Sequence, residues 1–207
     1  MSKGVIPMPQ TVEITQDEQL TIEIARLFPR QGQWTEADYF RLPETNRIIE
    51  LSEGRLIITP SPTEQHQTVL GNLFVIMRTH VLSNKLGKII MSPMDTRLWE
   101  GKVRQPDIVF MSNEHLDRTT EKTWGVPDLV VEILSEGTAK VDKEDKYLEY
   151  QKAGVQEYWI VDPFNQSVEV YTLKNGTYEI FGKWGLGEIA KSKLLDGFKV
   201  SVDSIMA

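Results

Sequence analysis

Residues 128–137 read DLVVEILSEG, and this stretch sets the interpretation of the whole sequence. Apolar residues run through it, as in a strand that is buried on both faces. Glu132 stands in the middle of that run. Because side chains alternate along a strand, Glu132 shares a face with Val130 and Leu134. A buried carboxylate is costly unless it has a partner, so the sequence predicts that Glu132 has one.

Two further acids interrupt apolar runs. Asp107 precedes the apolar part of QPDIVFM, residues 105–111, on the face of Val109 and Met111, and Glu50 ends the apolar run of RIIEL. Each alone has an ordinary explanation, since a strand-end Asp accepts hydrogen bonds in turns and a buried Glu pairs with a structural Arg or Lys. Together they favour a shared cation, because packed carboxylates repel and raise each other's pKa. Mg²⁺ prefers such oxygen ligands.

Composition excludes several classes of protein. The chain has 207 residues, of which 40% are hydrophobic and 26% charged, as in an ordinary globular domain. The absence of cysteine excludes disulfides and thiolate metal sites. A net charge of −7 argues against a non-specific nucleic-acid coat protein, although it allows a local basic groove. Neither an export signal nor a membrane-spanning run is recognisable, so we expect a cytoplasmic protein without a membrane partner.

Local patterns predict a mixed α/β fold, α+β in arrangement, with helices packed on a central sheet. Three helices combine capping residues with helical apolar spacing: one capped by Thr35 and ended by Pro43, one capped by Ser61 with a stripe from Val69 to Val81, and one over 140–154 that Gly154 stops. Strands are expected at about 88–91, 94–99, 106–111, 128–134 and 156–163, with hairpins over 47–60 and 167–181, the latter turning at Asn175-Gly176.

The chain divides into an N-terminal arm with a helix, residues 1–33, and a single domain, residues 34–207. The arm lacks periodicity over its first 14 residues. The helix that follows begins with a capping-box pair, Thr15 and Glu18, and presents apolar residues from Leu20 to Phe28. That apolar stripe either packs on the domain or forms a dimer surface.

A Pro-Asp pair that opens a strand, followed by a Glu on the next apolar strand, resembles the motif of the PD-(D/E)XK nuclease superfamily. Four stretches extend the likeness to the Uma-two family, which is restriction-endonuclease-like: 48–67, 92–112, 127–163 and 194–202. The resemblance spans about residues 34–203. It implies a restriction-endonuclease-like domain, with a central mixed sheet flanked by helices.

The resemblance also implies a site. Asp107 and Glu132 would be metal ligands for Mg²⁺ or Mn²⁺, together with the backbone carbonyl of Ile133. The superfamily pattern places a lysine two residues after the Glu, where this chain has Leu134. In the Uma-two pattern the lysine lies on the following helix, at Lys146. Without the resemblance, Lys146 would be taken for a solvated helix lysine.

Glu50 matches an extra acidic position upstream of the motif. It would be a further metal ligand or would polarise the attacking water. The expected catalytic set is therefore Glu50, Asp107, Glu132 and Lys146.

Other polar residues have plainer explanations. His66 matches a histidine position of the family, but a lone histidine in a first helical turn is more often a capping or core residue. Asp95 is expected to make structural hydrogen bonds. Tyr158 and Trp159 should be core residues, and Asp162 a turn residue. The most basic part of the chain is expected to be charged surface or, alternatively, a phosphate-binding rim; it comprises Lys85, Lys88, Arg97, Lys102 and Arg104.

Three functions are compatible with these features. The first is a metal-dependent DNA endonuclease, with a homodimer to cut both strands. The second is a nuclease-fold module that binds nucleic acid or protein without catalysis. The third is a glycosidase that uses paired Glu and Asp, which the Pro-Asp placement and the nearby lysine disfavour.

Overall fold

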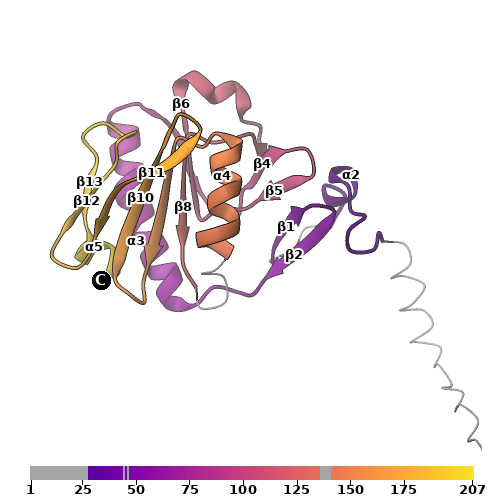
Figure 1. Cartoon of the computed structure of the whole chain (residues 1–207), viewed down its shortest axis with the longest axis horizontal. Coiled ribbons are helices and arrows are strands. Elements are labelled where there is room, and N and C mark those ends of the chain that lie inside the picture. The colour runs from indigo at the N-terminus through magenta and orange to yellow at the C-terminus, as the bar shows by residue number, and fades with distance from the viewer. Residues whose placement is uncertain (1–27, 44, 46, 136–140) are drawn as a thin grey trace, which may run out of the picture.

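The structure is a computed structural model that describes residues 28–207, except residues 44, 46 and 136–140. The expected arm and helix over residues 1–27 lie outside the described residues, so the division after residue 33 and the dimer stripe stay predictions. Within the described part, the mixed α+β architecture predicted from the sequence is confirmed: two large sheets and their helices make up the domain (Figure 1).

A six-stranded mixed sheet forms the centre of the domain. β8 and β9 are parallel, and the other neighbouring pairs are antiparallel. Its strands, in spatial order, are β11 (Thr177–Trp184), β10 (Ser167–Lys174), β9 (Glu157–Asp162), β8 (Leu129–Ile133), β6 (Ile108–Ser112) and β3 (Gly87–Met91). β8 and β9 are buried along their whole length, as their near-continuous apolar sequences predict.

Helices cover both faces of this sheet. The long α3 (Glu64–Ser83) packs on one face and the shorter α4 (Tyr147–Ala153) on the other (Figure 1). The α3 stripe, including Leu73 and Met77, joins the strand residues Val131 and Val161 in one core. None of the helices in the described part is long and apolar enough to cross a membrane.

The second core lies under α4. Tyr150 of α4 packs with Val130, Leu134, Tyr158 and Ile160. The expectation that Tyr158 and Trp159 are core residues is confirmed, since both are 0% exposed. Glu132 faces the same side of the sheet as Val130 and Leu134, so it must meet α4.

A five-stranded sheet lies beside the first (Figure 1). In spatial order it contains β2 (Arg55–Thr59), β1 (Ile48–Ser52), β5 (Lys102–Arg104), β4 (Asp95–Trp99) and β7 (Thr123–Trp124). The β1–β2 hairpin was predicted; β5 and β7 were not, because two or three residues are too few to show a period. The remaining elements are short: α2 (Glu36–Tyr39), η1 (Asn113–Arg118), η2 (Val141–Lys146), β12 (Ile189–Lys191), β13 (Lys199–Ser201) and α5 (Val202–Met206).

Two predicted helix boundaries were wrong, and a third helix differs in type at its start. α3 is capped by Thr63, whose hydroxyl accepts the His66 N–H, and not by Ser61. α2 ends at Tyr39, before Pro43. The helix expected over 140–154 begins as the π-helical η2 and becomes α-helical only at Tyr147; it stops at Gly154, with φ of 92°, as predicted.

Candidate active site

A cleft of about 690 Å³ brings together residues that lie far apart in the sequence. Its walls are the β1–β2 hairpin, the start of α3, the end of β8 and the η2 turn. The expected site residues all line it: Glu50, Asp107, Glu132, Ile133 and Lys146. His66 and Asp142 line it as well.

Asp107 stands immediately before β6 rather than inside a strand, and it is 7% exposed. Its Oδ2 atom accepts the Ile133 N–H at 2.7 Å and lies 3.3 Å from His66 Nε2. Its Oδ1 atom accepts no hydrogen bond from the described residues. Oδ1 is also not one of the fully buried polar atoms without a partner. One carboxylate oxygen is therefore anchored, and the other can accept a ligand from the cleft.

Glu132 repeats this arrangement. Its Oε1 atom accepts the Tyr150 hydroxyl at 2.6 Å and lies 2.9 Å from Lys146 Nζ. Its Oε2 atom accepts no hydrogen bond from the described residues. It is also not one of the fully buried polar atoms without a partner. Burial raises the pKa of Glu132 well above its ordinary value, and the neighbouring Asp142 and Asp107 carboxylates raise it further against the opposing effect of Lys146.

Lys146 is the last residue of η2, and its side chain lines the cleft. Its side chain is 11% exposed, and its ammonium also lies 3.0 Å from Asp142 Oδ1. Burial lowers the pKa of Lys146, but Glu132, Glu50, Asp142 and Asp107 together outweigh that effect, so the pKa rises well above its ordinary value. Carboxylates outnumber cationic groups around this ammonium, which explains why the pKa of Lys146 increases despite burial.

Glu50 has both oxygens engaged. Oε2 accepts from Arg104 Nη1 at 2.8 Å, and Oε1 accepts the Gln105 N–H at 2.9 Å. Burial would raise the pKa of Glu50, but the Lys146 and Arg104 charges lower it below its ordinary value. Glu50 is thus ionised and forms part of the cleft lining.

Two basic residues differ from the sequence expectation. Lys102 and Arg104 are 3% and 2% exposed and pair with Glu149 of α4, so neither is charged surface or a phosphate rim. Arg104 bridges Glu149 and Glu50, and thereby ties α4 to the second sheet. The sequence gives no signal for this network, because each acid lies 45 or more residues from the base that it pairs with.

The structure also places the remaining polar residues. Asp95 accepts hydrogen bonds from Tyr39 and Gln105, each at 2.7 Å, which is the structural role expected for it. Asp162 accepts the N–H groups of Phe164 and Asn165, as a turn residue does. His66 enters the cleft; burial lowers its pKa, but the contact with Asp107 outweighs burial and the pKa is raised.

Oxygen atoms that line the cleft are candidate donors to a metal ion. Across the described ranges, no three His, Asp or Glu side chains converge as a complete metal cluster. Two carboxylate oxygens nevertheless remain available, on Asp107 and Glu132. The β6–β8 ladder ends at the pair Ile108 and Val131, so the Ile133 backbone lies past the ladder, beside Asp107. Carboxylate and carbonyl oxygens suit Mg²⁺, which keeps several waters, so the residues fit such an ion.

Comparison with known proteins identifies the family and the fold of this chain. A family model, Uma2, described as "Putative restriction endonuclease", matches residues 36–203. The chain belongs to the Uma2 family. The chain is also similar to a solved structure from Anabaena variabilis, described as a "putative nuclease belonging to DUF820", with 21% identity and a TM-score of 0.69. That match covers 83% of this chain and 97% of the other, and it shows a shared fold. No curated protein matches the chain.

In this Uma2 chain, the strand position of the superfamily lysine is occupied by a core residue. Leu134 is 2% exposed, and its N–H pairs with Val161 of β9. Lys146 reaches Glu132 from η2 instead, as the resemblance implied for its location. Asp142 and Tyr150 lie four residues to either side of Lys146, and their contacts with Lys146 and Glu132 emerge only in the folded chain.

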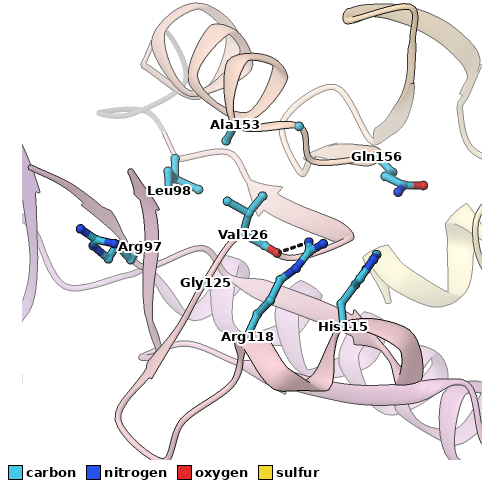
Figure 2. A pocket seen from close by; sticks show the side chains of 9 residues that line it. Arg97, Leu98, His115, Arg118, Gly125, Val126, Ala153 and Gln156 are labelled. Atoms are coloured by element: carbon cyan, nitrogen blue, oxygen red, sulfur yellow. Dashed lines mark hydrogen bonds between the residues drawn. The ribbon is translucent and has the colours of Figure 1, made fainter. Parts of the chain in front are cut away.

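A second pocket, of about 660 Å³, lies near the C-terminal end of α4 (Figure 2). Figure 2 shows His115 and Arg118 side by side at its edge and Arg97 at its other end. Arg97 is paired with Glu36 and His115 with Asp128, so much of the basic charge is already neutralised. The carboxylate set of the first cleft has no counterpart among the residues that line this pocket.

Proposed function

We propose that this Uma2 protein is a metal-dependent endonuclease that hydrolyses phosphodiester bonds in DNA. One observation carries the proposal. Asp107 and Glu132 each have one anchored oxygen and one available oxygen in the same cleft, beside the buried Lys146 ammonium.

The proposed cation is Mg²⁺ or Mn²⁺, held by Asp107, Glu132 and the carbonyl of Ile133. When bound, such an ion would neutralise charge on the phosphate oxygens and lower the pKa of the attacking water. Hard oxygen donors and the excess of carboxylates in the cleft support this choice.

The side chains of the protein have separate tasks in the proposed reaction. Lys146 orients the attacking water and stabilises negative charge as it develops in the transition state, because a buried ammonium acts strongly where water is excluded. Tyr150 fixes the Glu132 carboxylate through its hydroxyl. Glu50 helps to keep Lys146 protonated by raising its pKa. The family description, a putative restriction endonuclease, supports DNA as the substrate. The proposal includes a two-fold homodimer, because such a dimer would present two sites to the two strands.

Nicking of supercoiled plasmid tests the proposal, with Mg²⁺ or Mn²⁺ at several salt concentrations, because phosphate contacts make DNA binding salt-dependent. Glu132→Gln should weaken metal affinity, with activity partly restored at high Mn²⁺. Lys146→Ala should retain or tighten metal binding but lower the rate by about 10²-fold or more, as for loss of one preorganised charge. Lys143→Ala is the matched control, since Lys143 lies on the same turn but pairs with Asp162 and is 42% exposed.

Two results would contradict the proposal. If the purified wild type cuts neither DNA nor RNA with any divalent cation, while metal still binds at Asp107, the nuclease-fold binding module becomes the better description. Equal loss of rate in the Lys143 and Lys146 variants would remove the specific role of Lys146.

A further inference from the structure

His66 is the third residue of α3, and its position is fixed from two sides. The Thr63 hydroxyl caps the helix by accepting the His66 N–H at 3.2 Å. The helix then packs on the sheet through residues such as Leu70 and Leu73, which are 1% and 0% exposed. The His66 side chain is 10% exposed. A capped and packed helix end therefore holds the imidazole rigidly against the cleft.

The His66 ring contacts one of the groups proposed to hold the cation. Nε2 lies 3.3 Å from Asp107 Oδ2. The same Asp107 oxygen accepts the Ile133 N–H at 2.7 Å. Oδ2 thus accepts a main-chain N–H and also faces the imidazole nitrogen at 3.3 Å.

The protonation pattern of the ring is consistent with a donor. Nδ1 is fully buried and has no hydrogen-bond partner among the described residues. A buried N–H without an acceptor costs free energy, so the proton belongs on Nε2, the nitrogen that faces the carboxylate. A nitrogen that donates a proton to Asp107 has no lone pair left for a metal ion.

We propose that His66 is a positioning residue for Asp107: the Nε2–H group binds Oδ2 and leaves Oδ1 directed at the cation. The inference rests on the proposed metal-dependent function and adds a role that the two acids and the lysine do not fill. Ligating carboxylates in proteins are themselves held by hydrogen bonds, and loss of such a partner typically lowers metal affinity by about 10- to 100-fold. The same size of effect is expected here.

Calorimetric titration of the full chain with Mn²⁺ alone tests the role, without any measurement of nuclease activity. His66→Leu removes the donor and should weaken Mn²⁺ affinity by about 10- to 100-fold. His66→Gln retains an N–H group at about the same reach and should bind Mn²⁺ with nearly wild-type affinity, well short of the loss in His66→Leu. His80→Gln is the matched control, because His80 lies on the same helix and contacts the Asp196 carbonyl outside the cleft.

A purely structural role for His66 would lower stability without this difference between the Leu and Gln variants. Unfolding midpoints without metal are measured alongside. If His66→Leu does not fold, His66→Asn replaces it, since the shorter amide cannot reach Asp107 and should lose affinity as the Leu variant does.

Each outcome decides the matter. Wild-type affinity in the Leu or Asn variant overturns the inference. Equal losses in the Gln and Leu variants also overturn it, because they indicate that the imidazole ligates the ion directly. If the wild type binds no Mn²⁺, or if Asp107→Asn leaves Mn²⁺ affinity unchanged, the proposed function fails and this inference fails with it.

Discussion

At the scale of the residue, buried charges in this protein are stabilised by side chains of opposite charge. Glu149 is the clearest case outside the proposed metal ligands. Its two oxygens accept from Lys102 Nζ at 2.7 Å and from Arg104 Nε and Nη2 at 2.8 Å, and its side chain is 15% exposed. Burial would raise the pKa of Glu149, but the Arg104 and Lys102 charges lower it below the ordinary value of 4.5.

Glu149→Gln should lower the free energy of unfolding at pH 7 by about 3 kcal/mol, because two buried cations each lose one of their counter-charges. The folded-state pKa is depressed, so the contribution is complete above the unfolded-state pKa and is lost as pH falls through the folded-state pKa. The difference between variant and wild type should therefore shrink below about pH 4.5, the ordinary glutamate pKa. Urea unfolding of both proteins at several pH values measures this difference in the free energy of unfolding.

The control is Glu179→Gln, in the exposed pair with Lys174, where the side chains are 62% and 58% exposed. Solvent screens such a pair, so the free energy of unfolding of Glu179→Gln should differ little from that of wild type at every pH measured. A pH-independent loss in Glu149→Gln would show that packing, rather than charge, explains its effect.

At the scale of the element, the ends of helices position the site. α3 begins at the cleft because Thr63 caps it, and η2 adopts π-helical geometry where it delivers Lys146. The Tyr158 hydroxyl donates to the Asp142 carbonyl at 3.0 Å and holds that turn against the sheet. Single-turn π-helical segments are frequent at functional sites.

Thr63→Ala should destabilise the protein by about 1 kcal/mol, because the cap that accepts the His66 N–H is lost. Chemical denaturation measures the effect, and Thr63→Ser should restore most of it. Thr79→Ala is the control in the same helix, where the hydroxyl only donates back to the Val75 carbonyl. A larger effect of Ser61→Ala than of Thr63→Ala would show that the helix begins earlier.

At the scale of the whole molecule, the cleft lies where the two sheets meet. Glu50 belongs to the five-stranded sheet and Glu132 to the six-stranded sheet, while Arg104 and Glu149 connect the second sheet to α4. A cation that binds between these parts would stabilise the assembled domain relative to the unfolded chain.

Mg²⁺ or Mn²⁺ at about 100 times its Kd should therefore add about 2.7 kcal/mol and raise Tm by several degrees, which differential scanning fluorimetry measures. Asp107→Asn should abolish the increase, and relief of repulsion should offset part of its cost in the metal-free protein. Asp117→Asn, on the exposed η1 segment, is the control. An equal metal-induced increase in the Asp107 variant would rule out the proposed site.

The sequence by itself determined the elements whose signals are local and periodic. The α3 stripe, the β1–β2 and β10–β11 hairpins and the stop at Gly154 follow from the spacing of apolar residues and from turn chemistry within a few positions. The motif around Asp107 and Glu132, taken with the four longer stretches that resemble Uma-two, was likewise sufficient to identify the family. It also located Lys146, although the role of each residue in the site stays a proposal.

Only the tertiary structure decided which charged residues are buried and with which partners. Lys102 and Arg104 resemble surface residues in the sequence and become buried, because Glu149 and Glu50 meet them across 45 to 54 positions. The approach of His66 to Asp107 has the same origin. Hydrogen bonds and ion pairs depend on distances in space, and a local pattern along the chain carries no record of a partner that arrives from another element.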